Sequence, residues 1–364
     1  MTLIFLVIFA ALVFTYINGF HDTANSIATV VATKVLTPRQ AVMLAAVTNL
    51  VGAFAGTAVA TTIASGLVDP EVATSEVLIC ALVAGIAWNL LTWWFGMPAS
   101  SSHALVGGLC GACLAAAHNN WDVLVWSVPS PKHWWLSKGL LWKVIVPMIT
   151  SPVCGLVFGF LLMGVLYFLL RNWRPAAVNR TFGKLQLFSS AYMGFSHGTN
   201  DAQKTMGIIA LALLTGTTSG LFDHLPGWLS FLRTAPAGAN QPLEIAAWIK
   251  VLCALTMCAG TAVGGWRIIK TLGHKMVRLH PVHGFAAETT GATVLVTAAY
   301  FGMPVSTTHA VTTSIMGVGC AKGLNQLKLE VVERIIWAWI MTLPASGAVA
   351  YLLVKAAQAA GWIS

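Results

Sequence analysis

Charged residues are scarce in this 364-residue sequence: Asp, Glu, Lys and Arg make up 9% of it, while 57% is hydrophobic. A soluble protein keeps about a quarter of its residues charged, so water cannot be the main solvent of this chain. A helical membrane span needs roughly 20 apolar residues, and the long apolar runs leave room for about ten such segments. We therefore predict an all-α polytopic membrane protein that lies in a lipid bilayer.

Three other features are missing from the sequence. No basic run precedes the apolar residues 1–18, so we expect them to begin a retained transmembrane helix rather than a signal peptide. The net charge of +9 comes from basic residues scattered among loops, which indicates membrane topology rather than nucleic-acid binding. Cys110 and Cys113 have no second pair or histidine at zinc spacing, so we interpret the seven cysteines as packing residues.

The apolar segments divide into two sets of five, separated by a basic connector. This predicts a first transmembrane repeat (1–170), a cytoplasmic connector (171–184) and a second transmembrane repeat (185–364). The segments are expected at about 2–35, 39–64, 76–95, 98–117 and 140–170, and then at 185–215, 245–265, 284–300, 304–321 and 331–358.

Two unlike motifs recur in the same order in both halves. Gly96-Met-Pro-Ala-Ser-Ser-Ser-His returns as Gly302-Met-Pro-Val-Ser-Thr-Thr-His, and Gly19-Phe-His-Asp-Thr-Ala-Asn returns as Gly198-Thr-Asn-Asp-Ala-Gln-Lys. The recurrence indicates an internal duplication. Five crossings are an odd number, so the second repeat would enter the membrane from the opposite face, as in the inverted repeats of secondary transporters. Whether 98–117 and 304–321 span the membrane or re-enter stays open.

The basic residues support one orientation. With the N-terminus outside, thirteen of the twenty Lys and Arg residues fall in inside loops and six outside, while Lys204 lies within a helix. An excess of basic residues in cytoplasmic loops is the usual sign of orientation in helical membrane proteins.

Four charged residues are expected at membrane depth: Asp22, Asp201, Lys204 and Glu288. Each such charge costs at least ~2.5–3.5 kcal/mol on insertion scales, so it persists mainly where it functions or pairs. The two aspartates occupy matching positions of the duplicated motif. Their matching positions favour a functional role for the two aspartates, namely binding of the coupling ion.

The residues before each aspartate favour a helix break. Asn18-Gly19 and His197-Gly198 supply flexible, turn-prone backbone. We predict helices broken near the bilayer midplane, whose free carbonyls help to bind a cation. Asp22 and Asp201 would then be metal ligands if the coupling ion is sodium. The alternative is a pair of kinked helices with capping aspartates.

The second motif predicts an oxyanion site. Pro98 and Pro304 suit the start of a helix, and each precedes a run of hydroxyl residues. Hydroxyl donors and free backbone N–H groups at a helix N-terminus bind tetrahedral anions. The alternative is capping and helix packing by the same side chains. The two runs are Ser100, Ser101, Ser102 and Ser306, Thr307, Thr308.

His103 and His309 follow these runs and leave three roles open. Each is a structural hydrogen-bonding group, a proton relay or half of a Ser–His nucleophilic pair. The last role would make the protein an intramembrane hydrolase, but the elements come twice and no G-x-S-x-G or H-E-x-x-H motif is present. A passive channel lacks repeated filter residues. Transport is the interpretation we adopt, without an enzymatic activity.

The motifs resemble those of the inorganic phosphate transporter family. The likeness rests on Gly19-Phe-His-Asp-Thr-Ala-Asn-Ser-Ile-Ala-Thr, on Ser196-His-Gly-Thr-Asn-Asp-Ala-Gln-Lys and on the paired G-M-P-x-S-[ST]-[ST]-H runs, over residues 18–310. It is nearest to the bacterial low-affinity branch. The resemblance implies an inverted-repeat fold, usually dimeric, in a bacterial inner membrane, with no cofactor. It further implies symport of phosphate with protons or sodium, in some members as a complex of phosphate with a divalent metal.

The resemblance also implies roles for single residues. Asp22, Asn25, Asn200 and Asp201 fall on signature positions, and Glu288 matches an intramembrane acid of the coupling machinery. Lys204 stands where many members repeat an asparagine, and Asn49 where some have an acid; both departures bear on sodium coupling. The expected phosphate-binding residues are Ser100, Ser101, Ser102, Ser306, Thr307, Thr308, Asn25 and Asn200. The expected coupling residues are Asp22, Asp201, Glu288, Lys204, His103 and His309.

The sequence therefore predicts a symporter that imports inorganic phosphate. A sulfate or other oxyanion permease of the same fold is the alternative, because sulfate is also tetrahedral.

Overall fold

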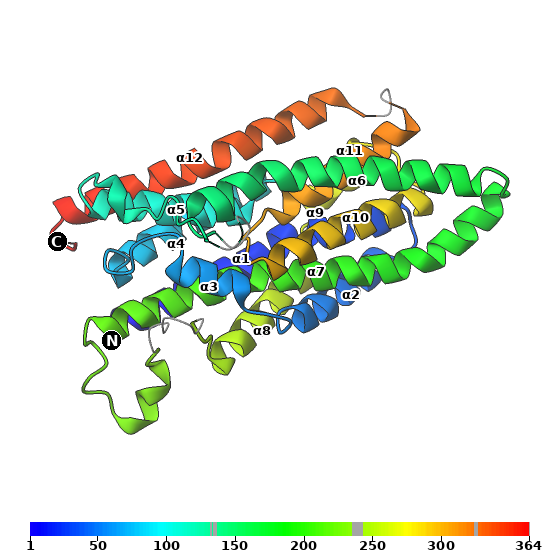
Figure 1. Cartoon of the computed structure of the whole chain (residues 1–364). Coiled ribbons are helices and arrows are strands. Elements are labelled where there is room, and N and C mark those ends of the chain that lie inside the picture. Colours follow the sequence, from blue (N-terminus) through cyan, green and yellow to red (C-terminus); the bar gives the residue numbers. More distant parts are fainter. Residues whose placement is uncertain (132, 134–136, 235–242, 324–326, 364) are drawn as a thin grey trace.

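The computed structural model is an elongated helical bundle and describes residues 1–131, 133, 137–234, 243–323 and 327–363. Both termini lie at one end of the bundle, and the turn between α6 and α7 lies at the other (Figure 1). The helices are α1 (Thr2–Ala32), α2 (Pro38–Gly52), α3 (Ala58–Ser65), α4 (Ser75–Trp94), α5 (Ser101–Ala116), α6 (Val146–Leu170), α7 (Pro175–Thr218), α8 (Ala247–Val263), α9 (Trp266–Lys270), α10 (Pro281–Tyr300), α11 (Thr307–Lys322) and α12 (Leu329–Ala359).

The distribution of side chains is that of a membrane protein. Helices Thr2–Ala32, Ser75–Trp94, Leu141–Leu170 and Leu329–Ala359 are long and apolar enough to cross a bilayer. On α6, large apolar side chains such as Ile149, Phe158 and Phe168 are exposed, whereas the interior holds buried Asp, Asn, Ser and Thr residues. A surface of this kind is favourable in lipid and unfavourable in water, so the prediction of a multi-pass membrane protein is confirmed.

The two halves of the chain use the same order of elements. Each begins with a long helix (α1, α7), continues with a broken segment (α2–α3, α8–α9) and a hairpin (α4–α5, α10–α11), and ends with a long helix (α6, α12). The packing is reciprocal: α1 packs on α8 as α7 does on α2, and α12 on α5 as α6 does on α11. Reciprocal packing is what two related halves would produce. The inverted orientation of the halves stays a prediction.

The predicted count of ten crossings is wrong, because α4–α5 and α10–α11 are re-entrant hairpins. Their turns touch: Ser102 Oγ donates to Val305 O at 2.9 Å, and Thr308 Oγ1 donates to Ala99 O at 2.9 Å. In the ten-span count these turns lie on opposite membrane faces, roughly 30 Å apart. Hairpins whose turns meet inside the molecule cannot each cross the bilayer. The predicted count of ten crossings therefore does not hold.

The predicted breaks in α1 and α7 are also wrong. Both helices run without interruption through 18–26 and 197–204. Gly19 serves close packing instead, because a Cβ atom there would lie 2.8 Å from Met257 O of α8. The interruptions fall in the packing partners, between α2 and α3 and at Gly264 between α8 and α9, where φ is +78° and the span bends by 57°.

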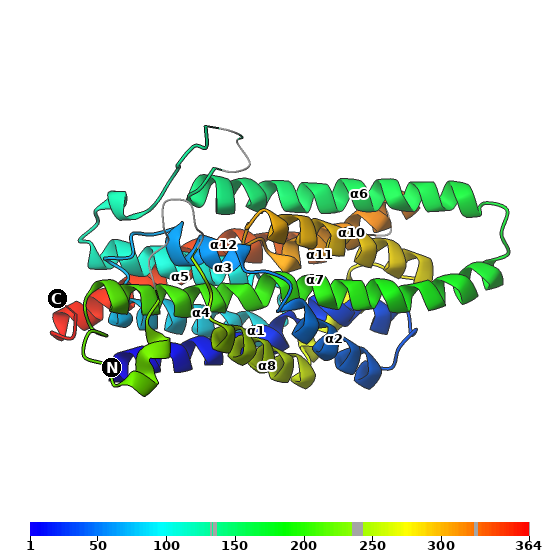
Figure 2. The ribbon, with the colours of Figure 1, turned by 60° about the horizontal axis from the view of Figure 1, so that its bottom comes forward.

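Most of the predicted connector, 171–184, is helical, and its role as a cytoplasmic connector stays a prediction. Only 171–174 lie outside helices, and 175–184 form the first turns of α7. Figure 2 shows this turn at the end of the bundle opposite to both termini.

Candidate functional site

The two motif aspartates meet at the centre of the bundle. Asp22 on α1 and Asp201 on α7 are both buried, and each lies within 4.8 Å, ligand atom to ligand atom, of the other and of His197. We call these three residues the aspartate cluster. Two carboxylates and an imidazole could hold a cation, because carboxylate oxygens and neutral imidazole are common ligands of metal ions.

Each aspartate has its own polar partners. Lys204 Nζ, itself buried, donates a hydrogen bond to Asp201 Oδ1, and His197 Nε2 lies 3.1 Å from Asp201 Oδ2. Asp22 Oδ1 lies 2.8 Å from Nδ1 of His21, whose Nε2 lies 3.0 Å from Thr92 Oγ1 of α4. A buried charge is tolerated when it is paired and hydrogen-bonded, and Lys204 provides this for Asp201.

The N-terminus of α11 faces the aspartate cluster. Thr307 Oγ1 lies 3.3 Å from Asp201 Oδ2, and Thr308 Oγ1 lies 3.4 Å from Asp22 Oδ1. Asn25 Nδ2 lies 2.9 Å from Thr308 Oγ1. The first turn of a helix carries free N–H groups and a partial positive charge, which favour an anion. Thr307, Thr308 and Asn25 thus place hydroxyl, amide and helix-terminal donors beside the carboxylates.

The serines of α5 divide into different roles. Ser100 and its counterpart Ser306 are N-caps, accepting hydrogen bonds from His103 N at 3.2 Å and His309 N at 3.1 Å. Ser102 donates to the opposite hairpin. Ser101 Oγ is buried without a hydrogen-bond partner among the described residues. Capping engages Ser100 and Ser306, while the role of Ser101 as a phosphate contact stays a prediction.

The two histidines pack against each other behind the hydroxyl runs. The ring centroids of His103 and His309 are 4.8 Å apart, and His309 lies 4.0 Å from the ring of Trp339 on α12. Trp339 Nε1 donates to Pro98 O at 3.1 Å. The pair joins the two hairpins and α12. No Ser–His hydrogen bond of the nucleophilic kind is formed by either ring in the described part of the chain.

Glu288 forms a separate polar site on α10. Its carboxylate accepts hydrogen bonds from Thr29 Oγ1 at 2.5 Å, from Gln186 Nε2 at 3.0 Å and from Ser189 Oγ. Thr29 is one helical turn from Asn25 on α1, so the two sites lie along one face of that helix. None of the ion pairs among the described residues includes Glu288.

Asn200, which precedes Asp201 on α7, contacts the turn of the second hairpin. Its Nδ2 donates to Met303 O at 3.3 Å, and its Oδ1 is buried without a hydrogen-bond partner among the described residues. Asn49 is buried on α2, and its Nδ2 donates to Thr261 Oγ1 of α8 at 3.1 Å.

The sequence interpretation missed His197 as a member of the site. The sequence pattern places it in turn-prone backbone, whereas His197, Asp201 and Lys204 are spaced i, i+4 and i+7 on one helix. This spacing puts the three side chains on the same face, which is a signal that a helical reading would have found. The donors Gln186, Ser189 and Thr29 around Glu288 were also missed, because long-range partners leave no local pattern.

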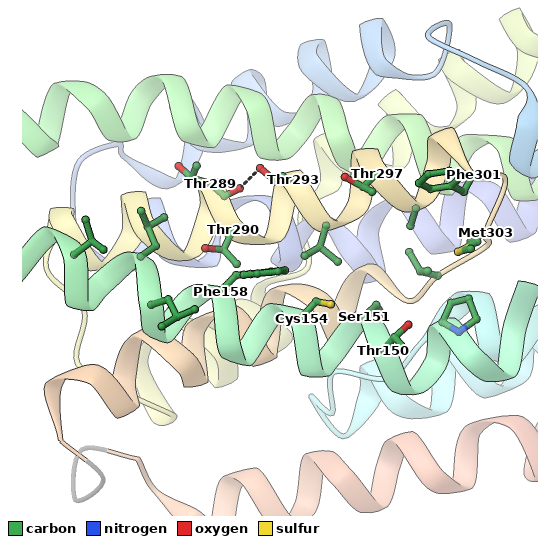
Figure 3. A pocket seen from close by; sticks show the side chains of 17 residues that line it. Thr150, Ser151, Cys154, Phe158, Thr289, Thr290, Thr293, Thr297, Phe301 and Met303 are labelled. Carbon is green, nitrogen blue, oxygen red and sulfur yellow. Dashed lines mark hydrogen bonds between the residues drawn. The ribbon is translucent and has the colours of Figure 1, made fainter. Parts of the chain in front are cut away.

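A pocket of about 480 Å³ between α6 and α10 is unrelated to this site. Figure 3 shows Phe158, Cys154 and the threonines of α10 along its wall. Thr293 Oγ1 donates to Thr289 O of its own helix at 2.8 Å, and no predicted site residue lines the pocket. The lining is apolar and borders the exposed side of α6, as a lipid-facing groove would.

Buried carboxylates, amides and hydroxyls inside a bundle with an apolar exterior are the features of a membrane transporter. The chain belongs to the phosphate transporter family, whose model matches residues 18–177 and 170–350. This family consists of transporters, so the prediction that the chain is not an enzyme is confirmed.

Individual relatives agree with this assignment. A probable low-affinity inorganic phosphate transporter of Bacillus subtilis is 40% identical over 355 residues, covering 96% of each chain. A relative of the same name from Mycobacterium tuberculosis is 42% identical over 347 residues, covering 95% of this chain and 76% of its own length. A solved structure of a sodium-dependent phosphate transporter has the same fold, with a TM-score of 0.79 at 23% identity, covering 99% of this chain and all of its own.

Proposed function

We propose that this chain imports inorganic phosphate by symport with protons. The observation that carries the proposal is the buried Lys204 ammonium bonded to Asp201, beside the hydroxyl-lined N-terminus of α11. The names of the relatives support phosphate as the substrate. Thr307, Thr308, Asn25 and Ser101 are the residues that we expect to contact it.

Charge balance is the reason for coupling. Phosphate and two carboxylates repel one another in a buried site unless positive charge accompanies them. Lys204 supplies one such charge permanently, at the position that matches Asn25 in the first half. In this proposal Lys204 takes the place of one coupling cation, and protons supply the rest.

Glu288 is a candidate carrier of the coupled proton. It is buried, accepts three side-chain hydrogen bonds and forms none of the ion pairs of the described residues. An ionisable residue at membrane depth is a functional candidate by default, and proton relays commonly use Asp, Glu and His. Asp22, His103 and His309 are the other candidates. We expect transport by rocking or gating of the two halves around the central site.

Sodium coupling is the second candidate, because the aspartate cluster offers two carboxylates and an imidazole within 4.8 Å. The structural relative is named as sodium-dependent, which also favours this candidate. In that case Asp22 and Asp201 bind the sodium ion, and Lys204 only holds Asp201 in place.

Uptake of labelled phosphate into proteoliposomes tests the proposal, with proton, sodium and divalent-metal gradients imposed one at a time. Proton symport predicts uptake that rises as the outside pH falls and responds little to sodium. Lys204→Asn should then create a sodium response, and Glu288→Gln should remove the pH response. A wild-type protein that needs sodium and ignores pH would contradict proton coupling. Uptake only with a divalent metal would identify a metal–phosphate complex as the substrate.

The substrate itself is tested by competition. Arsenate, which has the charge and shape of phosphate, should compete strongly, and sulfate weakly. Equal competition by sulfate would move the assignment to a general oxyanion permease.

A further inference from the structure

A second cavity, of about 1020 Å³, lies beside α3 and does not include the aspartate cluster. We call it the α3 cavity. Its wall is built from the α2–α3 junction, α3, the segment before α6, one face of α7 and the end of α10. Lys138 and Lys143 line it, and none of the described residues in its wall is acidic. Two lysine side chains in one wall make a cavity that attracts anions.

The α3 cavity lies toward the end of the molecule that carries both termini. Ser65, the last residue of α3, lines it and is exposed. The loop that follows pairs with 123–125, where Asp69 N donates to Val123 O at 2.8 Å and Val125 N donates to Leu67 O at 3.0 Å. Figure 2 shows α3 in the half of the bundle that holds the termini. The distribution of basic residues predicts that this end faces the outside.

One wall of the α3 cavity is the turn of the second hairpin, and side chains from three elements hold that turn. Lys143 Nζ donates to Phe301 O at 2.8 Å, and Thr62 Oγ1 of α3 donates to Gly302 O at 2.7 Å. On the far side, Asn200 of α7 donates to Met303 O at 3.3 Å. The same turn leads into Thr307 and Thr308. It therefore connects the wall of the α3 cavity to the threonines that contact the aspartate cluster.

We propose that the α3 cavity is an outer oxyanion site, in which Lys138 and Lys143 hold phosphate before it passes the turn at 301–306. The ligand class follows from two lysines that share the cavity wall with hydroxyl and amide side chains, in a cavity of about 1020 Å³. The identity of the anion as phosphate rests on the proposed function. The site is distinct from the aspartate cluster and shares no residue with it.

Lys143 also links the binding of an anion in the α3 cavity to the release of the turn at 301–306. A hydrogen bond from an ammonium to an ionised oxygen is roughly twice as strong as one between neutral groups. An anion in the α3 cavity therefore competes with the Phe301 carbonyl for Lys143 Nζ and weakens one of the three contacts on the turn. Arrival of the anion favours opening of the path toward Thr307 and Thr308.

The test uses a reporter cysteine at Ser65 in a chain whose seven native cysteines are replaced. The protein is reconstituted in vesicles of zwitterionic lipid, with Asp201 intact and with phosphate in large excess outside so that uptake does not deplete the anion. Inorganic phosphate in the outside solution should slow labelling of the Ser65→Cys thiol by a charged reagent. Lys143→Met and Lys138→Met should each raise the phosphate concentration needed for protection by roughly tenfold, the size of one charge-assisted hydrogen bond.

Matched variants exclude a general charge effect. Lys143→Arg keeps the cation and should retain protection, and Lys184→Met removes an exposed cation at the opposite end of the molecule and should change nothing. Protection that is equal in the wild-type lysine background, Lys143→Met and Lys138→Met would overturn the outer site. If Lys143→Met does not fold, Lys138→Met is the variant that tests the outer site, because Lys138 is exposed.

Two further arms separate related explanations. A phospholipid head group offers the same phosphate chemistry, so the labelling is repeated in vesicles that contain an anionic lipid. Protection by anionic lipid and none by inorganic phosphate would show that the α3 cavity is not a binding site for the substrate. Phosphate protection together with absent phosphate uptake by the protein with Asp201 intact would contradict the proposed function while supporting the outer site.

Discussion

At the scale of residues, the centre of this protein is a set of polar groups that share partners. Asp201 is held by Lys204 and His197, and Thr307 links it to the hydroxyl run. Removal of one group from such a set leaves another buried without its partner, which is costlier than removal of both. Stability and uptake should therefore respond differently to single and double substitutions.

Asp201→Asn tests the ion pair. It leaves the Lys204 ammonium buried without its carboxylate, so we expect a loss of about 3–5 kcal/mol in the free energy of unfolding, together with loss of uptake. Asp201→Asn combined with Lys204→Met should recover much of the stability and none of the uptake. Denaturation in detergent and uptake in vesicles measure the two effects. Equal stability of the single and double variants would show that the pair is not energetically linked.

Ser100 and Ser101 should separate capping from substrate binding. Ser100→Ala removes the N-cap of α5 and should lower stability by about 0.5–2 kcal/mol. Ser101→Ala removes a hydroxyl that has no hydrogen-bond partner among the described residues, so stability should hardly change while the KM for phosphate rises. Thermal unfolding and the concentration dependence of uptake distinguish them. An unchanged KM for Ser101→Ala would remove this hydroxyl from the site.

At the scale of elements, close helix contacts place the aspartates. Gly19 of α1 and Gly260 of α8 approach so closely that a Cβ on Gly260 would clash with Tyr16 O. In the reciprocal contact, a Cβ on Gly52 of α2 would clash with Phe195 O of α7. Small residues at such crossings let helix backbones pack in membranes. A Cβ on Gly198, the motif glycine of α7, would likewise clash with Asn49 O of α2, so both motif glycines serve close packing in unbroken helices.

Glycine substitutions test this packing. Gly52→Ala and Gly260→Ala should each lower the free energy of unfolding by about 1–3 kcal/mol, the cost of overpacking a tight contact. Gly164 on α6 has no neighbouring atom within 4 Å of an added Cβ, so Gly164→Ala should be neutral or stabilise by up to about 1 kcal/mol. Unfolding of the three variants in detergent gives the comparison. A loss of stability from Gly164→Ala as large as from the other two would contradict the assignment of close contacts.

At the scale of the whole molecule, the re-entrant hairpins change the number of crossings without changing the sides of the long loops. Each hairpin returns to the face from which it enters, so the long loops keep the sides that ten crossings would give them. The turns at 95–100 and 301–306 move from the membrane surfaces to the interior. There they bring the N-termini of α5 and α11 together.

Cysteine labelling checks this topology in a chain without native cysteines. Reporter cysteines at Arg174 and Lys270 should react only with reagent on the cytoplasmic side, and reporters at Asp69 and Asp122 only with reagent outside. Asp69 and Asp122 should label from the same side, because the backbone pairs 67–69 with 123–125. If all four positions labelled from one face, the predicted arrangement of the halves would be wrong.

The sequence by itself determined the class of this protein and the residues that matter most. Scarce charge and long apolar runs match a lipid environment, so they identify a membrane protein before any helix packing is known. Duplicated motifs identified the family and brought Asp22, Asp201, Thr307 and Thr308 forward as candidates. These features are local, and a single segment carries each of them.

Only the tertiary structure decided how those residues meet and where the chain bends. Asn18-Gly19 is compatible with either a break in α1 or a close helix crossing. Packing against α8 produces the crossing. The contact of Asn25 with Thr308, the assembly of donors around Glu288 and the meeting of the two hairpin turns join residues far apart in the chain. Such contacts arise from helix packing, because residues from different helices carry no shared periodicity in the sequence.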